Sequence, residues 1–284
     1  MAILAAPPVK RAQAHLAGKP GIWSTPYALP PDKQILAVDP AIQMGPKVKK
    51  AVSTENQTLR FYGRRKGRPL SQAMQRRLDE MLPRLLMTAG PHTMASLLEM
   101  FAAEDGPPPT ELCLEIGFGG GEHLSALAKA GPQMGFIGAE PFVNGVVSLL
   151  RHIEDQQLKN IRIWPDDVRL MLSGLPASCL SFVYVMFPDP WPKTRHAGRR
   201  ILNPEMLDRL AQCLKPGGRL RFASDHPVAK SWLLAEAIRH PAFSWTAQTA
   251  QDWRERPADW PQTRYMSKGV REGRASSWFD FVRI

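Results

Sequence analysis

From residue 111 to the C-terminus, apolar segments of strand length alternate with segments of helical periodicity. We expect seven strands: Leu112–Ile116, Phe136–Ala139, Ile161–Trp164, Leu180–Phe187, Leu220–Ala223, Phe243–Ala247 and Trp278–Arg283. Five helices are expected between the first six strands: Glu122–Ala130, Val143–Glu154, Asp167–Leu172, Pro204–Leu214 and Val228–His240. Strands joined by helices pair in parallel, whereas no helix is expected between the last two strands. The pattern therefore predicts a doubly wound α/β fold, with a mostly parallel seven-stranded sheet and a C-terminal antiparallel hairpin.

The N-terminal part of the chain lacks this alternation. Residues 1–58 contain eight prolines and no sustained helical or strand period, so we expect a basic, proline-rich disordered extension. A folded domain is expected over residues 59–284. It begins with Arg60–Arg68, which has five positive charges in nine residues and two aromatic side chains, a composition that suits phosphates and bases. Ser71 is then expected to cap a helix that Pro83 kinks or ends.

The charge balance indicates the class of partner. There are 37 Lys and Arg residues against 26 Asp and Glu residues, and the net charge of +11 favours a nucleic acid. The three cysteines have no C-x-x-C spacing, which argues against a disulfide framework or a cysteine-rich zinc site. No apolar run approaches 18 residues. We therefore expect a cytoplasmic protein that has no metal and no membrane partner; the composition leaves open whether it is a monomer or a homodimer.

A glycine-rich turn follows the first predicted strand, in the segment Glu115–Glu122 with the sequence EIGFGGGE. Glycines such as Gly117 let a ligand approach the backbone closely, and the next helix presents its N-terminus there. A dinucleotide site would have a third glycine where Glu122 stands, and a carboxylate there would repel a pyrophosphate. The turn favours a cationic ligand without phosphate, such as S-adenosylmethionine, and Glu115 at the strand end can hydrogen-bond that ligand or its waters.

Acidic residues also follow the next two predicted strands. Glu140 ends the second strand, where a carboxylate can accept hydrogen bonds from both ribose hydroxyls. Asp166 and Asp167 follow the third strand. Either of them could accept a hydrogen bond from the adenine amino group, and the sequence does not choose between them. Enzymes that bind NAD share the acid after the second strand, so the set of acids, rather than Glu140 alone, indicates the ligand.

The fourth predicted strand runs into Phe187–Lys193, with the sequence FPDPWPK. Two prolines hold Asp189 rigidly at the carboxyl edge of the sheet, where ligands bind in open α/β folds. A basic run follows, formed by Arg195, His196, Arg199 and Arg200, and it can hold a phosphate backbone. Near the C-terminus, Asp225 follows the fifth strand, and the segment Thr263-Arg264-Tyr265-Met266 precedes two further arginines.

Together these motifs resemble the tRNA (guanine-N7-)-methyltransferase family, which acts on guanine 46 in the variable loop of tRNA. The resemblance covers roughly residues 59–284, and it implies a Rossmann-like methyltransferase fold with S-adenosylmethionine as cofactor and tRNA as substrate. It implies cofactor contacts for Glu115, Gly117, Glu140, Asp166 and Asp189, with Asp189 also the catalytic acid. It implies substrate contacts for Lys193, Asp225, Thr263, Arg264, Tyr265 and Met266.

Alternatives remain at this point. Where the family has glutamate, this chain has Met266, which cannot accept hydrogen bonds from the guanine edge. A tRNA-binding protein with reduced activity is therefore one alternative. A second is an amino-group methyltransferase of nucleic acid, although those enzymes have an Asn/Asp-Pro-Pro-Tyr/Trp motif rather than Pro-Asp-Pro-Trp. An NAD-dependent oxidoreductase is disfavoured by Glu122.

Overall fold

The computed structural model describes residues 61–102 and 107–284. Its strands are β1 (Glu111–Ile116), β2 (Met134–Ala139), β3 (Ile161–Trp164), β4 (Leu180–Met186), β5 (Leu214–Ser224), β6 (Phe243–Trp245) and β7 (Ser277–Arg283). Its α-helices are α1 (Gln72–Leu85), α2 (Met94–Glu99), α3 (Glu122–Ala130), α4 (Val143–Gln156), α5 (Val168–Leu172), α6 (Pro204–Cys213), α7 (Pro227–Arg239), α8 (Gln251–Arg254) and α9 (Arg264–Arg271). A 3-10 helix, η1, spans Thr194–Arg199. The extension predicted for residues 1–58 lies outside the described residues.

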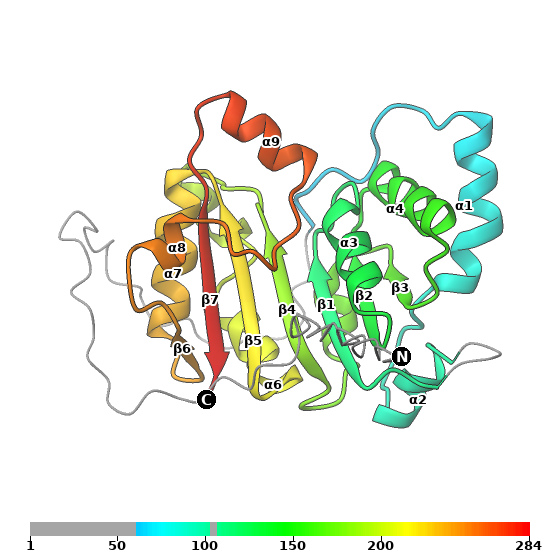
Figure 1. Ribbon diagram of the computed structural model, residues 1–284, viewed down its shortest axis with the longest axis horizontal. Coiled ribbons are helices and arrows are strands. Elements are labelled where there is room, and N and C mark those ends of the chain that lie inside the picture. Colours follow the sequence, from blue (N-terminus) through cyan, green and yellow to red (C-terminus); the bar gives the residue numbers. More distant parts are fainter. Residues whose placement is uncertain (1–60, 103–106) are drawn as a thin grey trace, which may run out of the picture. The chain divides into compact units, whose positions relative to one another are not determined.

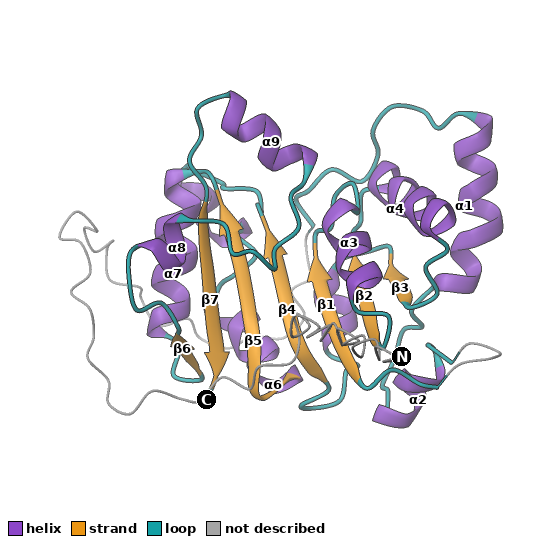
Figure 2. Ribbon diagram, in the orientation of Figure 1, coloured by secondary structure: helices purple, strands orange, loops and turns teal. Residues whose placement is uncertain are grey.

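The strands form one seven-stranded sheet in the order β3-β2-β1-β4-β5-β7-β6 (Figure 2). Strands β1 to β5 pair in parallel, and β7 pairs antiparallel with both β5 and β6. Helices pack on the sheet, and the parallel strands all point toward the same edge (Figure 1). The predicted doubly wound, mostly parallel fold is confirmed. Its ligands are expected at this carboxyl edge.

The strand sequences explain why the sheet is buried. Every residue of β2 is buried, and β1 is buried except at Glu111, as expected for parallel strands covered on both faces. Leu114, Val183 and Phe222, from three neighbouring strands, belong to one core cluster and are each fully buried. The buried strands therefore give a fixed platform for the loops at their carboxyl ends.

The C-terminal part agrees with the prediction in its strand pairing and differs from it in its helices. Strands β6 and β7 do pair antiparallel, but β7 lies between β5 and β6. The expectation of no helix between them was wrong, because α8 and α9 fall there. The sequence of α9 resembles a polar surface loop since only Met266 and Gly269 of the helix are buried. The periodic apolar signal of a longer amphipathic helix is therefore missing.

Strand β5 also begins earlier than predicted. Helix α6 ends at Cys213, as the Lys-Pro-Gly-Gly sequence indicates, but the strand starts at once with Leu214. The pairing register with β4 shifts in this stretch, and Gly217 has φ of +79°. The residues that stop the helix thus form an irregular start to the strand.

At the N-terminal side, Ser71 caps α1 as predicted, and its side chain accepts a hydrogen bond from the Met74 backbone N–H at 3.3 Å. Pro83 lies inside α1, which ends two residues later. Helix α2, with a capping box between Thr93 and Ser96, was not predicted. In the described part of the chain, no helix is both long and apolar enough to span a membrane, and no cluster of His, Cys, Asp and Glu could hold a metal ion.

Candidate active site

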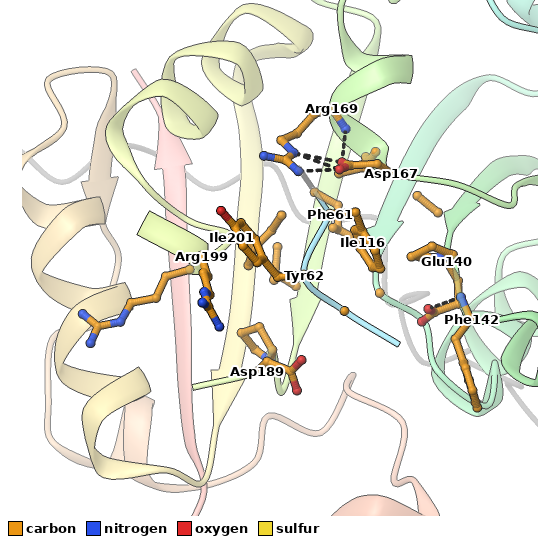
Figure 3. A pocket seen from close by; sticks show the side chains of 18 of the residues that line it. Phe61, Tyr62, Ile116, Glu140, Phe142, Asp167, Arg169, Asp189, Arg199 and Ile201 are labelled. Atoms are coloured by element: carbon orange, nitrogen blue, oxygen red, sulfur yellow. Dashed lines mark hydrogen bonds and ion pairs between the residues drawn. The ribbon is translucent and has the colours of Figure 1, made fainter. Parts of the chain in front are cut away.

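A pocket of about 540 Å³ opens at the carboxyl ends of the parallel strands (Figure 3). Four successive strand ends supply one predicted residue each: Gly117 after β1, Glu140 after β2, Asp166 after β3 and Asp189 after β4. The volume falls within the range of small-molecule sites in proteins. The structure therefore brings these four residues together around one cavity.

The glycine-rich turn between β1 and α3 leaves its backbone open to a ligand. Gly117 and Gly119 have φ values of +73° and +55°, and a Cβ atom at either position would meet no other atom within 4 Å. Gly121, with φ of +79°, packs against α4, since a Cβ there would lie 2.7 Å from the Leu149 Cβ. The first two glycines thus give access to the backbone, and the third allows close helix packing.

Glu140 is held in a fixed orientation by two backbone donors. Its Oε2 accepts a hydrogen bond from the Gly119 N–H at 2.8 Å, and its Oε1 accepts one from the Phe142 N–H at 2.9 Å. Burial raises the pKa of the Glu140 carboxyl, with smaller contributions from the charges of Glu115 and Asp189, while the two backbone hydrogen bonds act in the opposite direction. Each carboxylate oxygen retains a second lone-pair direction, so Glu140 can accept further hydrogen bonds from a ligand.

The two acids after β3 have different surroundings. Asp167 is the N-cap of α5 and also binds the Arg169 guanidinium, with Nε at 3.0 Å. The Asp166 side chain is 40% exposed, and its Oδ1 forms an ion pair with the Arg65 Nη2 at 2.7 Å. Asp167 is therefore committed to local structure, which leaves Asp166 as the acid better able to contact a ligand.

Asp189 lies on an unusual stretch of backbone. Phe187 and Trp191, on either side of the Pro-Asp-Pro sequence, have φ values of +50° and +40°, which side chains other than glycine rarely adopt. The carboxylate of Asp189 is exposed at the pocket. The strained flanks and the two prolines together fix its position relative to the end of β4.

An aromatic and cationic cluster forms the wall beside Asp189. The Arg199 guanidinium lies between two rings, with its Cζ 4.6 Å from the Tyr62 centroid and 5.0 Å from the Trp191 centroid. Such cation–π contacts are favourable and still leave the guanidinium N–H groups able to donate at their edges. Lys193, the residue before η1, is exposed beyond this wall.

Glu115 is not among the residues that line the described pocket. Its side chain is 1% exposed, and Oε2 lies 2.8 Å from the His123 Nδ1. The structure thus places the Glu115 side chain inside the protein, near enough to Glu140 for its charge to raise the pKa of that carboxyl.

The predicted substrate residues of the C-terminal part lie beside the end of β4. Tyr265 packs its ring on Phe187, with centroids 4.9 Å apart, and its hydroxyl donates to Asp225 Oδ1 at 3.3 Å. Asp225 is buried and also forms an ion pair with Arg274 at 3.3 Å. Thr263 is the N-cap of α9. These contacts place the start of α9 over the loop that carries Asp189.

Met266 lies on the opposite side of α9 from the solvent. It is 5% exposed and packs in a small apolar cluster with Ala223, Trp260 and Trp278. Arg264, two residues earlier, points to the glycine-rich turn and binds Glu122. The methionine thus supports α9 from within. The sequence alone did not indicate this, because the other apolar residues of the helix, Tyr265 and Val270, are exposed and mark no buried face.

Residues 61–64 also line the pocket, and sequence reasoning missed them as pocket residues. This segment is anchored on α4, where the Val143 N–H donates to the Arg65 carbonyl oxygen at 3.0 Å and Asn144 Oδ1 accepts from the Gly67 N–H at 2.8 Å. The basic and aromatic composition of this stretch predicted contacts with nucleic acid. It carried no signal that the chain folds back across the sheet edge.

Comparisons with known proteins agree with this geometry. A family model described as "Putative methyltransferase" matches residues 109–277. The chain is 49% identical over 227 residues to the tRNA (guanine-N(7)-)-methyltransferase of Rhodospirillum rubrum, and the matched residues make up 79% of this chain and 88% of that protein. It is 44% identical over 224 residues to the tRNA (guanine-N(7)-)-methyltransferase of Azorhizobium caulinodans, covering 79% and 95% respectively.

Among solved structures, the chain is similar to one described as "Structure of an Antibiotic Related Methyltransferase", at 16% identity and a TM-score of 0.46, over 69% of this chain and 97% of that one. That similarity is too distant to assign a function. The sequence relatives are close and nearly full-length. This chain therefore belongs to the tRNA (guanine-N7-)-methyltransferase family.

Proposed function

We propose that this protein transfers a methyl group from S-adenosylmethionine to N7 of a guanine in tRNA, at position 46 in the variable loop. The observation that carries the proposal is the convergence of Gly117, Glu140, Asp166 and Asp189 on one pocket. Beside the pocket lies a basic rim, whose cations include Arg64, Arg65, Lys193, Arg195, Arg199 and Arg264. Acidic groups suit a cationic cofactor, and a basic rim suits a polyanionic substrate.

The pocket residues fit the cofactor on chemical grounds. Glu140, oriented by the Gly119 and Phe142 N–H groups, would accept hydrogen bonds from the ribose hydroxyls. Asp166 would accept one from the adenine amino group. The open backbone at Gly117 and Gly119 would allow the methionine part to lie close to the turn. When bound, S-adenosylmethionine supplies an electrophilic methyl group on a positively charged sulfur.

Asp189 would act by electrostatics rather than by removing a proton. Guanine N7 carries an in-plane lone pair and no hydrogen, so attack needs no general base. Positive charge develops on the purine as the methyl group arrives, and a carboxylate held by two prolines can stabilise it without reorganising. The exposed position of Asp189 at the pocket mouth supports this assignment.

The rim residues would hold the tRNA and present its base. Lys193 and the guanidinium of Arg199 are candidates for phosphate contacts, which position a nucleic acid without reading its sequence. Tyr265 and Phe187 form an aromatic pair beside Asp189 on which an unstacked guanine can rest. Removing the base from its stack costs a few kcal/mol, and stacking on a protein ring returns part of that cost.

Incubation of the protein with a tRNA transcript and methyl-labelled S-adenosylmethionine, followed by digestion to nucleosides, tests the proposal. Labelled 7-methylguanosine is the expected product, and a transcript with adenosine in place of guanosine 46 should remain unlabelled. Label in an exocyclic amino group would instead support the amino-group methyltransferase. Absence of label with retained tRNA binding would support the non-catalytic alternative that Met266 suggests.

A further inference from the structure

Glu122, the first residue of α3, makes a contact that the proposed chemistry does not use. Its Oε2 accepts a hydrogen bond from the Arg264 backbone N–H at 3.0 Å, and its Oε1 accepts one from the Arg264 guanidinium. The two residues are 142 positions apart in the sequence. Glu122 is absent from the lining of the described pocket. Its carboxylate therefore joins the glycine-rich turn to the start of α9.

The backbone at Arg264 sets the position of the residues that follow. Tyr265 is next in the chain; its ring packs against Phe187 at a tilt of 49°, and its hydroxyl donates to Asp225. Phe187 begins the loop that carries Asp189. A hydrogen bond to the first N–H of α9 also satisfies a donor that a helix leaves unpaired. A displacement of the Arg264 backbone would thus move the Tyr265 ring relative to Asp189.

We propose that Glu122 is a positioning residue, which holds the first turn of α9 against the glycine-rich turn so that the substrate side of the site is aligned with the cofactor side. This inference rests on the proposed function, since the substrate to be aligned is tRNA. Figure 1 shows α9 beyond the carboxyl ends of the parallel strands, above β4 and β5, with its N-terminal end toward α3.

The direction in which tRNA methylation changes when Glu122 is removed distinguishes a positioning residue from a simple surface charge. Glu122 is an anion on a protein of net charge +11, close to a rim that binds a polyanion. If it acted only as a charge, its removal would strengthen tRNA binding. If it positions α9, its removal disorders the substrate contacts and weakens methyl transfer.

The test compares Glu122→Ala and Glu122→Gln with a control, Glu154→Ala. Glu154 lies on α4 and pairs with Arg77 of α1 at 2.7 Å, so the control also removes one negative charge and one ion pair between distant segments. Steady-state methylation of a tRNA transcript, binding of S-adenosylmethionine, and hydrogen exchange of residues 263–271 in the free protein are measured for each variant.

We expect Glu122→Ala to lower kcat/KM for tRNA at least five-fold, with cofactor Kd changed less than two-fold and faster hydrogen exchange in residues 263–271. Glu122→Gln should have a smaller decrease in kcat/KM, because its amide oxygen can still accept the hydrogen bond from the Arg264 N–H. The control, Glu154→Ala, should leave kcat/KM for tRNA, the cofactor Kd and the hydrogen exchange of residues 263–271 unchanged. An unchanged or higher kcat/KM for tRNA in Glu122→Ala, or unchanged exchange in residues 263–271, would overturn the inference.

The exchange measurement needs no substrate, so it separates the two proposals. A wild-type protein that does not methylate tRNA, with faster exchange in Glu122→Ala, refutes the proposed function but supports the tether. An active wild type whose kcat/KM and exchange are both unaffected by Glu122→Ala refutes the tether alone.

Discussion

Substitution of Met266 by glutamate tests whether this position faces the substrate or the protein interior. Relatives in the family are expected to have an acidic acceptor here, so the change would restore a hydrogen bond to guanine if the side chain reached the base. In this structure Met266 is 5% exposed and lies against Trp260, Trp278 and Ala223. Glutamate at this site would therefore enter an apolar cluster.

The expected loss of folding free energy in Met266→Glu follows from the burial of an unpaired carboxylate. A buried charge without its partner costs about 3–5 kcal/mol, which is a large part of the roughly 5–15 kcal/mol that stabilises an ordinary domain. Burial favours the neutral acid, so the carboxyl of Met266→Glu should have a raised pKa in the folded protein. The unfolding free energy of this variant should then fall as pH rises from about 4.3, the unfolded value, to the raised folded pKa.

Three variants separate these effects. Met266→Glu should be destabilised, increasingly so at higher pH, and less active than the wild type. Met266→Gln should be destabilised without that pH dependence, because it has the same shape and no charge. Met266→Leu should reduce the free energy of unfolding by less than about 1.5 kcal/mol. Chemical denaturation across pH, with tRNA methylation at each pH, gives the measurements. A ten-fold gain in kcat/KM by Met266→Glu at unchanged stability would refute the buried placement as the functional state.

Four further tests address the site. Asp189→Asn should lower kcat by about 10²–10³, as loss of one preorganised electrostatic group does, and calorimetry should show an unchanged Tm. Glu140→Ala should weaken cofactor binding by about 1–3 kcal/mol, measured by titration calorimetry. Burial raises the pKa of Glu140 above its ordinary value of 4.5. As pH decreases, the wild-type protein should therefore begin to lose cofactor affinity at a pH above 4.5, when Glu140 is protonated. Glu140→Gln should not show this loss. The tRNA affinity should fall steeply with salt, by about 0.7–0.9 logarithmic units per phosphate contact for each ten-fold rise in concentration; a flat dependence would contradict the basic rim.

The sheet and the strand-end acids could be predicted because their signals are local. Buried parallel strands are continuous apolar runs, and each of β2, β3 and β4 is followed within three residues by the acid that we propose meets the ligand. Once the strands were assigned, topology alone brought Glu140, Asp166 and Asp189 to one edge. The choice between Asp166 and Asp167 required the structure, which shows that Asp167 caps α5 and binds Arg169.

The features that were missed depend on contacts between distant segments. The burial of Glu115 is one such feature, because it depends on the buried partner His123; its cofactor contact stays a prediction. Helix α9 shows too few apolar residues to be recognised, since it is held by Met266 beneath it and by Glu122 at its start. The return of residues 61–64 across the sheet edge depends on hydrogen bonds to α4. Glu122 and Arg264 are 142 positions apart, so their contact left no local signal, whereas Glu115 and His123 are eight apart but belong to different elements.

Two ion pairs join basic segments to the acidic side of the site, and their exposure indicates what they do. Arg65 and Asp166 have side chains 51% and 40% exposed, and Arg264 and Glu122 have side chains 74% and 21% exposed. Exposed pairs contribute about 0–1 kcal/mol to folding. Their value to the enzyme must therefore lie in geometry: each ties a segment of the basic rim to the end of β3 or to the turn after β1. Because the rim and the pocket are built from separate stretches of chain, we expect such ties to keep a bound guanine in register with the methyl donor. Their loss should appear in kcat/KM for tRNA long before it appears in Tm.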